Sequence, residues 1–245
     1  MLRCFLKPED WTGAHLTLSR EETRHLCRAR RARPGDFVTV LDGQGRQALA
    51  RLAALNADGT ACLRLLRETD TERSGPAVTL LQCVPKARNM DFIVQKAVEL
   101  GAGTIVPVLS ERVVSRPSAV QATRRHARWG RVAEESAKQS GAPWVPAVEP
   151  LCALADALAA VSGRVRLVGS LEPDAQPLRR VLGRVRAQAA TGIAVLIGPE
   201  GDLTEQELSS ARAAGFVPVS LGHTVLRVET AAVFVLSVLA YEFGR

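Results

Sequence analysis

Hydrophobic and polar positions follow two different patterns in two parts of the chain. Toward the N-terminus, short stretches alternate apolar and polar residues and are separated by turn dipeptides such as Pro34-Gly35 and Asp58-Gly59. This pattern is typical of β-strands joined by tight turns, and it predicts strands over residues 36–42, 46–55 and 59–68. A short helix is predicted over residues 19–30, where Ser19 and Glu22 match a capping box.

The pattern changes near residues 71–77. From there, continuous apolar runs alternate with segments of helical periodicity. The predicted strands are 78–84, 104–109, 165–170, 193–198 and 216–221, and the predicted helices are 89–100, 122–139, 175–189, 205–214 and 229–243. This alternation is typical of βαβ units with a mostly parallel sheet. We therefore expect an α/β fold in two domains: a small β domain over residues 1–72 and a parallel-sheet domain over residues 76–245.

Three predicted strands are followed by loops that contain glycine. The first loop begins with "GPEGD" at residue 198, the second with "LGHT" at residue 221 and the third with "VGSLEP" at residue 168. After the first loop, Thr204 and Glu207 match a capping box at the start of the next helix. Ligands of parallel sheets bind at the carboxyl ends of the strands, and glycine allows a close approach of the backbone. We expect one ligand to lie across the three loops. The motifs of dinucleotide and P-loop sites, of serine hydrolases and of HExxH metalloproteases are missing, and no metal is expected.

Composition and charge narrow the class of protein. The chain has 245 residues, of which 47% are hydrophobic and 23% are charged, and its formal net charge is +7. Six arginines lie within residues 20–33, which favours an anionic partner as much as it favours a solvated surface. Five scattered cysteines are expected to be small core residues. No uncharged apolar run is long enough to span a membrane and no signal peptide is recognisable, so we expect a cytoplasmic protein.

The chain resembles a known family along most of its length. "GPEGDLTEQEL" followed by "LGHTVLRVETAAVFVLSVL" is similar to the C-terminal signature of the SPOUT methyltransferases that act on uridine N3 of 16S ribosomal RNA, the RsmE family. Residues 24–46, 86–114 and 128–148 also resemble that family in order and spacing. The family has glycine where Asp202 stands, and proline and arginine where His223 and Thr224 stand.

The resemblance implies a fold, a cofactor and partners. The fold would be a PUA-like RNA-binding β-barrel followed by a SPOUT domain with a C-terminal trefoil knot that binds S-adenosyl-L-methionine. The partners would be 16S rRNA or the small ribosomal subunit and a second copy of the chain in a homodimer. The residues implied to bind the cofactor are Val168, Gly169, Gly198, Pro199, Glu200, Gly201, Leu221, Gly222, Leu226 and Arg227.

Two polar residues near the second loop are the candidates for catalysis. Arg227 stands in an otherwise apolar stretch, where a charge needs a function or a partner, and Glu229 precedes an apolar helix. An acidic residue in a first helical turn is also favourable by itself, so structure explains Glu229 as well as catalysis does. We expect Arg227 to stabilise a developing anion and Glu229 to accept a proton. The residues expected to contact RNA phosphates are Arg28, Arg30, Arg31 and Arg33.

Two alternatives stay open at the level of sequence. One is a SPOUT enzyme that methylates another RNA site, for instance a ribose 2′-hydroxyl. The other is a non-catalytic RNA-binding protein of ribosome assembly. Cofactor binding separates this last alternative from the enzymes, and the position of the methyl group on the product nucleoside separates the two enzymes.

Overall fold

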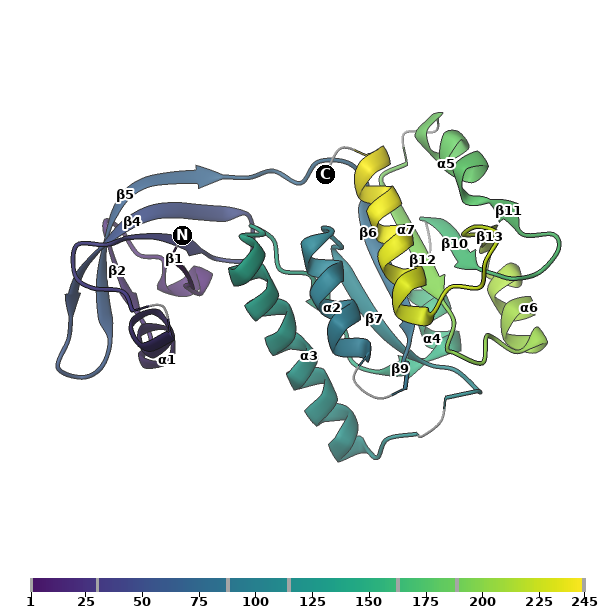
Figure 1. Ribbon diagram of the computed structural model, residues 1–245, viewed down its shortest axis with the longest axis horizontal. Coiled ribbons are helices and arrows are strands. Elements are labelled where there is room, and N and C mark those ends of the chain that lie inside the picture. The colour runs from purple at the N-terminus through teal and green to yellow at the C-terminus, as the bar shows by residue number, and fades with distance from the viewer. Residues whose placement is uncertain are drawn as a thin grey trace. The chain divides into compact units, whose positions relative to one another are not determined.

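The computed structural model describes residues 2–29, 31–86, 89–113, 116–161, 164–187 and 190–243, and it divides into two compact units (Figure 1). Unit 1 comprises Met1–Arg73 together with Glu134–Val145, and unit 2 comprises Ser74–Ala133 together with Pro146–Arg245. Unit 1 therefore takes one of its two segments from far along the chain. None of the helices in the described part of the chain combines the length and apolar composition that a membrane crossing needs.

Unit 1 is built on a five-stranded sheet of order β1-β3-β4-β5-β2. Its strands are β1 (Leu2–Phe5), β2 (His15–Leu18), β3 (Phe37–Leu41), β4 (Arg46–Leu55) and β5 (Ala61–Asp70). The pairs are antiparallel except β1 with β3, and two register shifts between β4 and β5 mark bulges that bend the sheet. The three strands predicted from alternation are confirmed, while the four-residue strands β1 and β2 were missed because they are too short for a periodic pattern.

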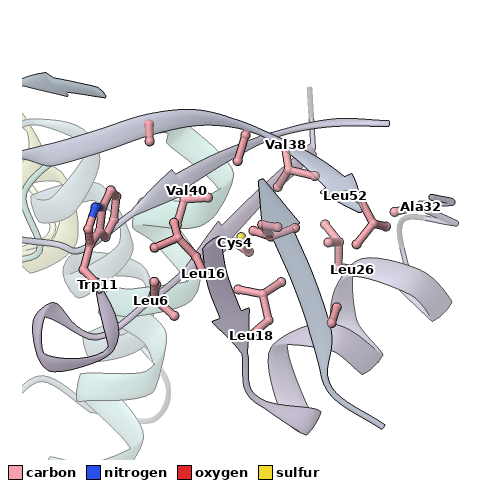
Figure 2. Packing of buried hydrophobic residues seen from close by; sticks show 14 residues of the cluster. Cys4, Leu6, Trp11, Leu16, Leu18, Leu26, Ala32, Val38, Val40 and Leu52 are labelled. Atoms are coloured by element: carbon pink, nitrogen blue, oxygen red, sulfur yellow. The ribbon is translucent and has the colours of Figure 1, made fainter. Parts of the chain in front are cut away.

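The concave face of this sheet holds the core of unit 1. Figure 2 shows side chains such as Cys4, Leu16, Val40 and Leu52 pointing toward one another from several strands, with Leu26 beside them. Cys4 and Leu16 are fully buried. Of the five cysteines, Cys4 and Cys83 are buried as expected of small core residues, whereas Cys27, Cys62 and Cys152 are only partly buried. The alternation of buried and exposed positions along β4 explains why this strand was visible in the sequence.

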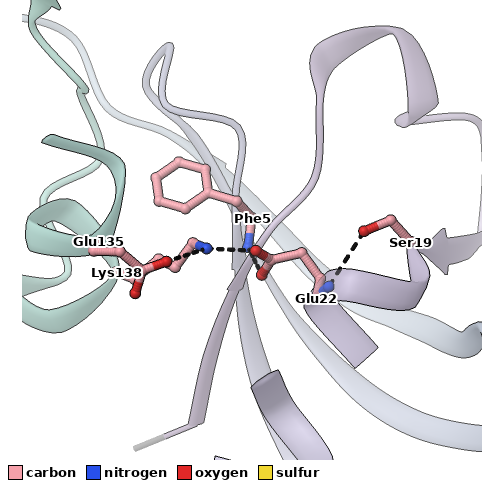
Figure 3. A network of polar contacts seen from close by, with 5 residues as sticks. All are labelled: Phe5, Ser19, Glu22, Glu135 and Lys138. Atoms are coloured by element: carbon pink, nitrogen blue, oxygen red, sulfur yellow. Dashed lines mark hydrogen bonds and ion pairs between the residues drawn. The ribbon is translucent and has the colours of Figure 1, made fainter. Parts of the chain in front are cut away.

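The helix predicted over residues 19–30 forms α1 (Arg20–Arg24) followed by a π-helical turn, η2 (His25–Ala29). Ser19 caps it by accepting a hydrogen bond from the Glu22 N–H. The second half of the predicted capping box is missing, because the Glu22 carboxylate accepts instead from the Phe5 N–H at 3.0 Å and from Lys138. Figure 3 shows Glu22 extended away from Ser19 toward these two partners.

Lys138 is the centre of this polar network (Figure 3). It lies near the end of α3 (Ala119–Ser140), is only 8% exposed, and pairs with Glu135 at 2.9 Å as well as with Glu22. Burial by itself lowers the pKa of Lys138, but the hydrogen bonds to Glu22 and Glu135 and their charges outweigh it and raise the pKa above its ordinary value. The network thus joins residues 134–145 to the strands of unit 1.

The same segment also joins a turn of unit 1 through backbone hydrogen bonds. Gly45 N–H donates to the Pro143 carbonyl and Val145 N–H donates to the Gly43 carbonyl, both at 2.9 Å. The Trp144 ring packs on Gly45, where an added Cβ would collide with the indole, and its Nε1 donates to the Thr71 carbonyl at 3.1 Å. Gly45 is therefore required for close approach at this position.

Unit 2 contains a parallel sheet of order β11-β13-β10-β12-β6-β7-β8, with β9 also paired to β7. The longer strands are β6 (Ala77–Cys83), β7 (Thr104–Leu109), β10 (Val165–Gly169), β12 (Gly192–Ile197) and β13 (Val217–Ser220), and the two-residue strands are β8 (Ala147–Val148), β9 (Cys152–Ala153) and β11 (Gln176–Pro177). All strand pairs of this sheet within the described residues are parallel, so the predicted βαβ fold class is confirmed.

Helices cover both faces of the parallel sheet. The helices besides α3 are α2 (Asn89–Glu99), α4 (Leu154–Ala160), α5 (Leu178–Ala187), α6 (Glu205–Ala213) and α7 (Val228–Glu242). Helices α2 and α7 pack against each other, and residues of α4 and α6 share a core cluster with Leu81, Cys83 and Leu196 on the sheet (Figure 1). Burial raises the pKa of the Cys83 thiol to about 12, so this thiol stays protonated near neutral pH. Among these helices, α4 was not predicted, because seven residues give too little periodicity, and the two-residue strands β8, β9 and β11 were not predicted either.

Candidate active site

The first wall of the site follows β12, where residues 198–202 lead into α6. The Thr204 hydroxyl caps α6 by accepting a hydrogen bond from the Glu207 N–H, and the Glu207 carboxylate accepts one from the Thr204 N–H at 2.9 Å. The capping box predicted at this helix is therefore confirmed. The second carboxylate oxygen of Glu207 accepts from the Glu111 N–H at 2.7 Å, just beyond β7.

Two further hydrogen bonds attach this wall to neighbouring strand exits. The Glu200 carboxylate accepts from the Lys86 N–H at 2.7 Å, beyond the end of β6, and Arg112 donates to the Gly201 carbonyl at 2.5 Å. Glu200 therefore acts as an acceptor for a backbone group of another loop and not as a cap of its own turn. Together with Glu207, these contacts fix a loop that has few side chains of its own.

Asp202 has a left-handed backbone, with φ of +61°. Its carboxylate accepts a hydrogen bond from the Leu203 N–H at 2.8 Å. Aspartate is one of the few residues that tolerate this conformation, because its short side chain can bond the local backbone. The backbone conformation explains why glycine stands here in the family that the sequence resembles.

The second wall is the segment between β13 and α7, residues 221–227. Gly222 has φ of +141°, and a Cβ added to it would meet no atom within 4 Å. The φ favours glycine, because an L-residue rarely adopts it, and the open space beside Gly222 leaves room for a ligand. The Ser220 hydroxyl donates to the Gly222 carbonyl at 3.0 Å and so holds the beginning of the segment.

These walls meet a third loop, which follows β10, to form a pocket of about 690 Å³. A volume of this size is ordinary for a small-molecule site. The residues that line it are Asn89, Gly169, Ser170, Leu171, Glu172, Ile197, Gly198, Pro199, Glu200, Asp202, Ser220, Leu221, Gly222, His223, Thr224, Val225, Leu226, Arg227, Val228, Glu229 and Ala231. The three loops that the sequence singled out therefore lie around one pocket.

Most of the residues implied to bind a cofactor line this pocket, and two do not. Val168 lies within β10, where it pairs with Leu196 and Pro218, and its side chain is fully buried in the core. Gly201 lies beside Arg112 and is not part of the lining. Sequence position alone could not separate these two from their neighbours Gly169 and Glu200, because only the fold decides which side of a strand end faces the pocket.

The two candidates for catalysis lie at the start of α7. Arg227 is the N-cap residue, is exposed, and has no hydrogen-bond or ion-pair partner for its side chain among the described residues. Glu229 is half-buried, and its carboxylate accepts a hydrogen bond from Asn89 at 3.2 Å. One pocket wall thus presents a free cation and an oriented carboxylate.

Asn89 was not predicted. It begins α2, which follows the exit of β6, and no functional residue was predicted at this strand exit. The signal that could have found it is a polar residue at the first turn of a helix that follows a parallel strand. Within the described residues, no three His, Cys, Asp or Glu side chains gather as a metal site requires.

The arginines predicted to bind RNA lie in unit 1, at and after the π-helical turn. Arg28, Arg31 and Arg33 are exposed, and their side chains have no partner within the part of the chain that the structure describes. Arg30 lies outside the described residues. The three described guanidinium groups are therefore free to contact an anion.

Comparison with known proteins identifies the class to which this fold and pocket belong. Residues 72–240 match the family described as RNA methyltransferase domain, and residues 18–64 match the RNA methyltransferase PUA domain. The chain belongs to this family of RNA methyltransferases. The confirmed fold class is thus a parallel-sheet methyltransferase domain preceded by a small PUA-like β domain.

The similar proteins narrow the family to ribosomal RNA small subunit methyltransferase E. The protein of that name from Synechocystis is 34% identical over 96% of this chain and 76% of its own length. The one from Bacillus subtilis is 27% identical over 92% of this chain and 90% of its length. A crystal structure of the Neisseria gonorrhoeae methyltransferase E bound to S-adenosyl methionine superposes with a TM-score of 0.86 and 34% identity, covering 98% of this chain and 97% of that one.

Proposed function

We propose that this chain methylates N3 of a uridine in 16S ribosomal RNA of the small subunit, with S-adenosyl-L-methionine as the methyl donor. The observation that carries the proposal is one pocket, formed by backbone-rich loops at the carboxyl ends of β10, β12 and β13, with Arg227 and Glu229 in its wall. The bound cofactor in the Neisseria gonorrhoeae relative supports the same assignment. Residues 76–245 carry this activity.

The residues of the pocket fit the cofactor. Open space beside Gly222 provides room for an adenosine group that a side chain would exclude, and the peptide groups of residues 198–202 and 221–226 offer hydrogen bonds to its base and ribose. Gly169, Leu221 and Leu226 complete the walls. When bound there, the cofactor supplies a methyl group on a positively charged sulfur.

The side chains at the start of α7 perform the proton chemistry. Uridine N3 carries a proton and must lose it before it can act as a nucleophile. Glu229 accepts this proton, while the negative charge that develops spreads onto the neighbouring carbonyl oxygens. Arg227 stabilises that charge, since a fixed cation in a pocket acts most strongly where the charge develops.

Replacing each of the two residues tests this mechanism. We expect Arg227→Ala and Glu229→Gln each to lower the single-turnover rate of RNA methylation by about 10² to 10⁴-fold, the usual contribution of a positioned acid–base group. Adenosylmethionine affinity, measured by calorimetry, should stay within a few-fold. Lys96→Ala, on the surface of α2, serves as the control and should leave both quantities unchanged.

Each contrary result has a definite meaning. Near-normal turnover of Glu229→Gln would reduce Glu229 to a favourable residue at a helix start. Loss of cofactor binding in Arg227→Ala would make Arg227 a part of the cofactor wall. Nucleoside analysis of the product that finds the methyl group on a ribose would replace the proposed function with its 2′-hydroxyl alternative, and a failure to bind the cofactor would favour a non-catalytic role.

Residues 1–72 bind the RNA in this proposal, through Arg28, Arg30, Arg31 and Arg33. Each phosphate contact contributes roughly 0.7 to 0.9 to the slope of log affinity against log salt. The double variant Arg28→Ala/Arg33→Ala should therefore lower RNA affinity and reduce this slope by roughly 1.4 to 1.8 in filter-binding measurements.

A matched variant separates a local contact from an effect of net charge. Arg179→Ala/Arg180→Ala removes the same charge from the exposed face of α5 in unit 2. It should change the salt slope less than the unit 1 variant does. Equal effects of the two variants would mean that the cluster in unit 1 acts only through its contribution to the overall charge.

The proposal includes a cytoplasmic homodimer. Helix α7 exposes Phe234 and Tyr241, which are 40% and 85% exposed, and the neighbouring α2 exposes Phe92. Large apolar side chains gathered on two adjacent helices favour contact with another protein surface. A second copy of this chain is the partner that the family resemblance implies.

A further inference from the structure

Asn89 presents a hydrogen-bond donor to the pocket beside Glu229. Its side-chain amide donates to one oxygen of the Glu229 carboxylate at 3.2 Å, and both residues line the pocket together with Arg227. An amide nitrogen carries two hydrogens, and this bond uses one of them. The described residues offer no partner for the second hydrogen, which is therefore available to a ligand.

The side chains of Asn89, Glu229 and Arg227 offer a donor, an acceptor and a donor of hydrogen bonds. Asn89 offers an N–H, the Glu229 carboxylate accepts, and Arg227 offers N–H groups. The edge of uracil around N3 carries the opposite set: a carbonyl oxygen, the N3–H donor and a second carbonyl oxygen. Cytosine differs because its N3 has no hydrogen and its position 4 carries an amino group, which cannot accept a bond from an amide donor.

We propose that Asn89 donates a hydrogen bond to one of the two carbonyl oxygens flanking N3, while its other hydrogen orients Glu229. If that oxygen is the one at position 4, Asn89 also selects uracil over cytosine, because both bases carry the carbonyl at position 2. This inference rests on the proposed uridine methylation. As the N3–H bond breaks, the proton passes to Glu229 and the electron pair stays on the ring. The carbonyl oxygen that faces Asn89 then gains negative charge, so the hydrogen bond strengthens as the reaction proceeds.

A double-mutant cycle that combines a change of Asn89 with a change of the uracil carbonyl oxygen tests the contact. The protein variant is Asn89→Leu, which keeps a similar size and removes both donors. The RNA variants carry 2-thiouridine or 4-thiouridine at the target position, because sulfur accepts hydrogen bonds weakly. Single-turnover methylation and, separately, equilibrium binding of each RNA are measured for both proteins, so that one readout does not depend on methyl transfer.

The expected result is a coupling of about tenfold between Asn89→Leu and one of the two thio-substitutions, in both readouts. That substitution should lower the methylation rate and the RNA affinity of the wild-type protein, and it should lower those of Asn89→Leu much less. The position of the sulfur that couples identifies the oxygen that Asn89 contacts. Lys96→Ala, on the same helix, should show no coupling with either substitution, and thermal unfolding verifies that each variant is folded.

Coupling below about threefold for both thio-substitutions, in a folded Asn89→Leu protein, would overturn the inference. This outcome differs from failure of the proposed function. If wild-type protein forms no N3-methyluridine in its RNA substrate, the proposed function is wrong, and the inference about Asn89 is wrong with it. If it does form this product and the cycle shows no coupling, uridine methylation stands and only the role of Asn89 is wrong.

Discussion

A single glycine gives the sharpest test of the proposed cofactor site at the scale of residues. Gly222 combines a φ of +141° with open space where a side chain would begin, and it lines the pocket. We expect Gly222→Val to abolish adenosylmethionine binding, because the branched side chain fills space that the ligand needs. Calorimetry of the folded variant measures this directly.

Backbone strain has to be separated from obstruction of the pocket, because valine is also unfavourable at the φ of Gly222. Gly13 provides the matched control: its φ is +75°, an added Cβ would likewise meet no atom within 4 Å, and it lies in unit 1 outside the pocket. Gly13→Val should strain the backbone and leave cofactor affinity unchanged. Unchanged affinity in a folded Gly222→Val protein would remove the proposed pocket.

At the scale of elements, the end of α3 is held to the strands of unit 1 by a buried ion pair. Removing Lys138 leaves the Glu22 carboxylate without its cation in a position that is mostly buried. We expect Lys138→Met to lower the free energy of unfolding by about 3 kcal/mol, because an uncompensated buried charge is costly. Denaturant unfolding measures the loss, and the double variant Lys138→Met/Glu22→Gln should recover part of it.

Lys96→Ala is the control for this prediction, since Lys96 and Glu99 form an ion pair that lies nearer to solvent. Lys96→Ala should lower the free energy of unfolding by about 0.5 kcal/mol or less.

The pH dependence of stability adds a second check on Lys138. Because folding raises the pKa of Lys138 above 10.5, its contribution should be complete below that pH and should decrease as the pH rises through the folded-state value. A pH-independent difference between wild type and Lys138→Met would contradict the assignment.

At the scale of the whole molecule, the exposed apolar residues of α7 predict self-association. We expect Phe234→Asp to convert a dimer into a monomer in sedimentation velocity, because a charge would have to be buried at the contact. Methylation should decrease with it if each pocket is completed at the interface. Val120→Asp, which changes an exposed hydrophobic residue of α3, should leave the dimer intact. A fully active wild-type monomer at micromolar concentration would exclude the homodimer.

Much of the fold is predictable from sequence because it depends on local signals. Alternation in β4, the buried runs of β10 and β12, and the capping box of Thr204 and Glu207 are each fixed by residues close together in the chain. The three glycine-containing strand exits were recognised for the same reason. Short elements such as β1 and α4 were missed, since a few residues carry no measurable period.

The sequence by itself thus determined the α/β class, the two kinds of domain, the pocket-forming loops and the candidates Arg227 and Glu229. Only the tertiary structure decided that Glu22 leaves its capping box for Lys138, that residues 134–145 pack with unit 1, and that Asn89 meets Glu229 from a helix 140 residues away in the chain. These contacts join residues distant in sequence. No local pattern encodes them, because their energy depends on burial and geometry that exist only after the chain has folded.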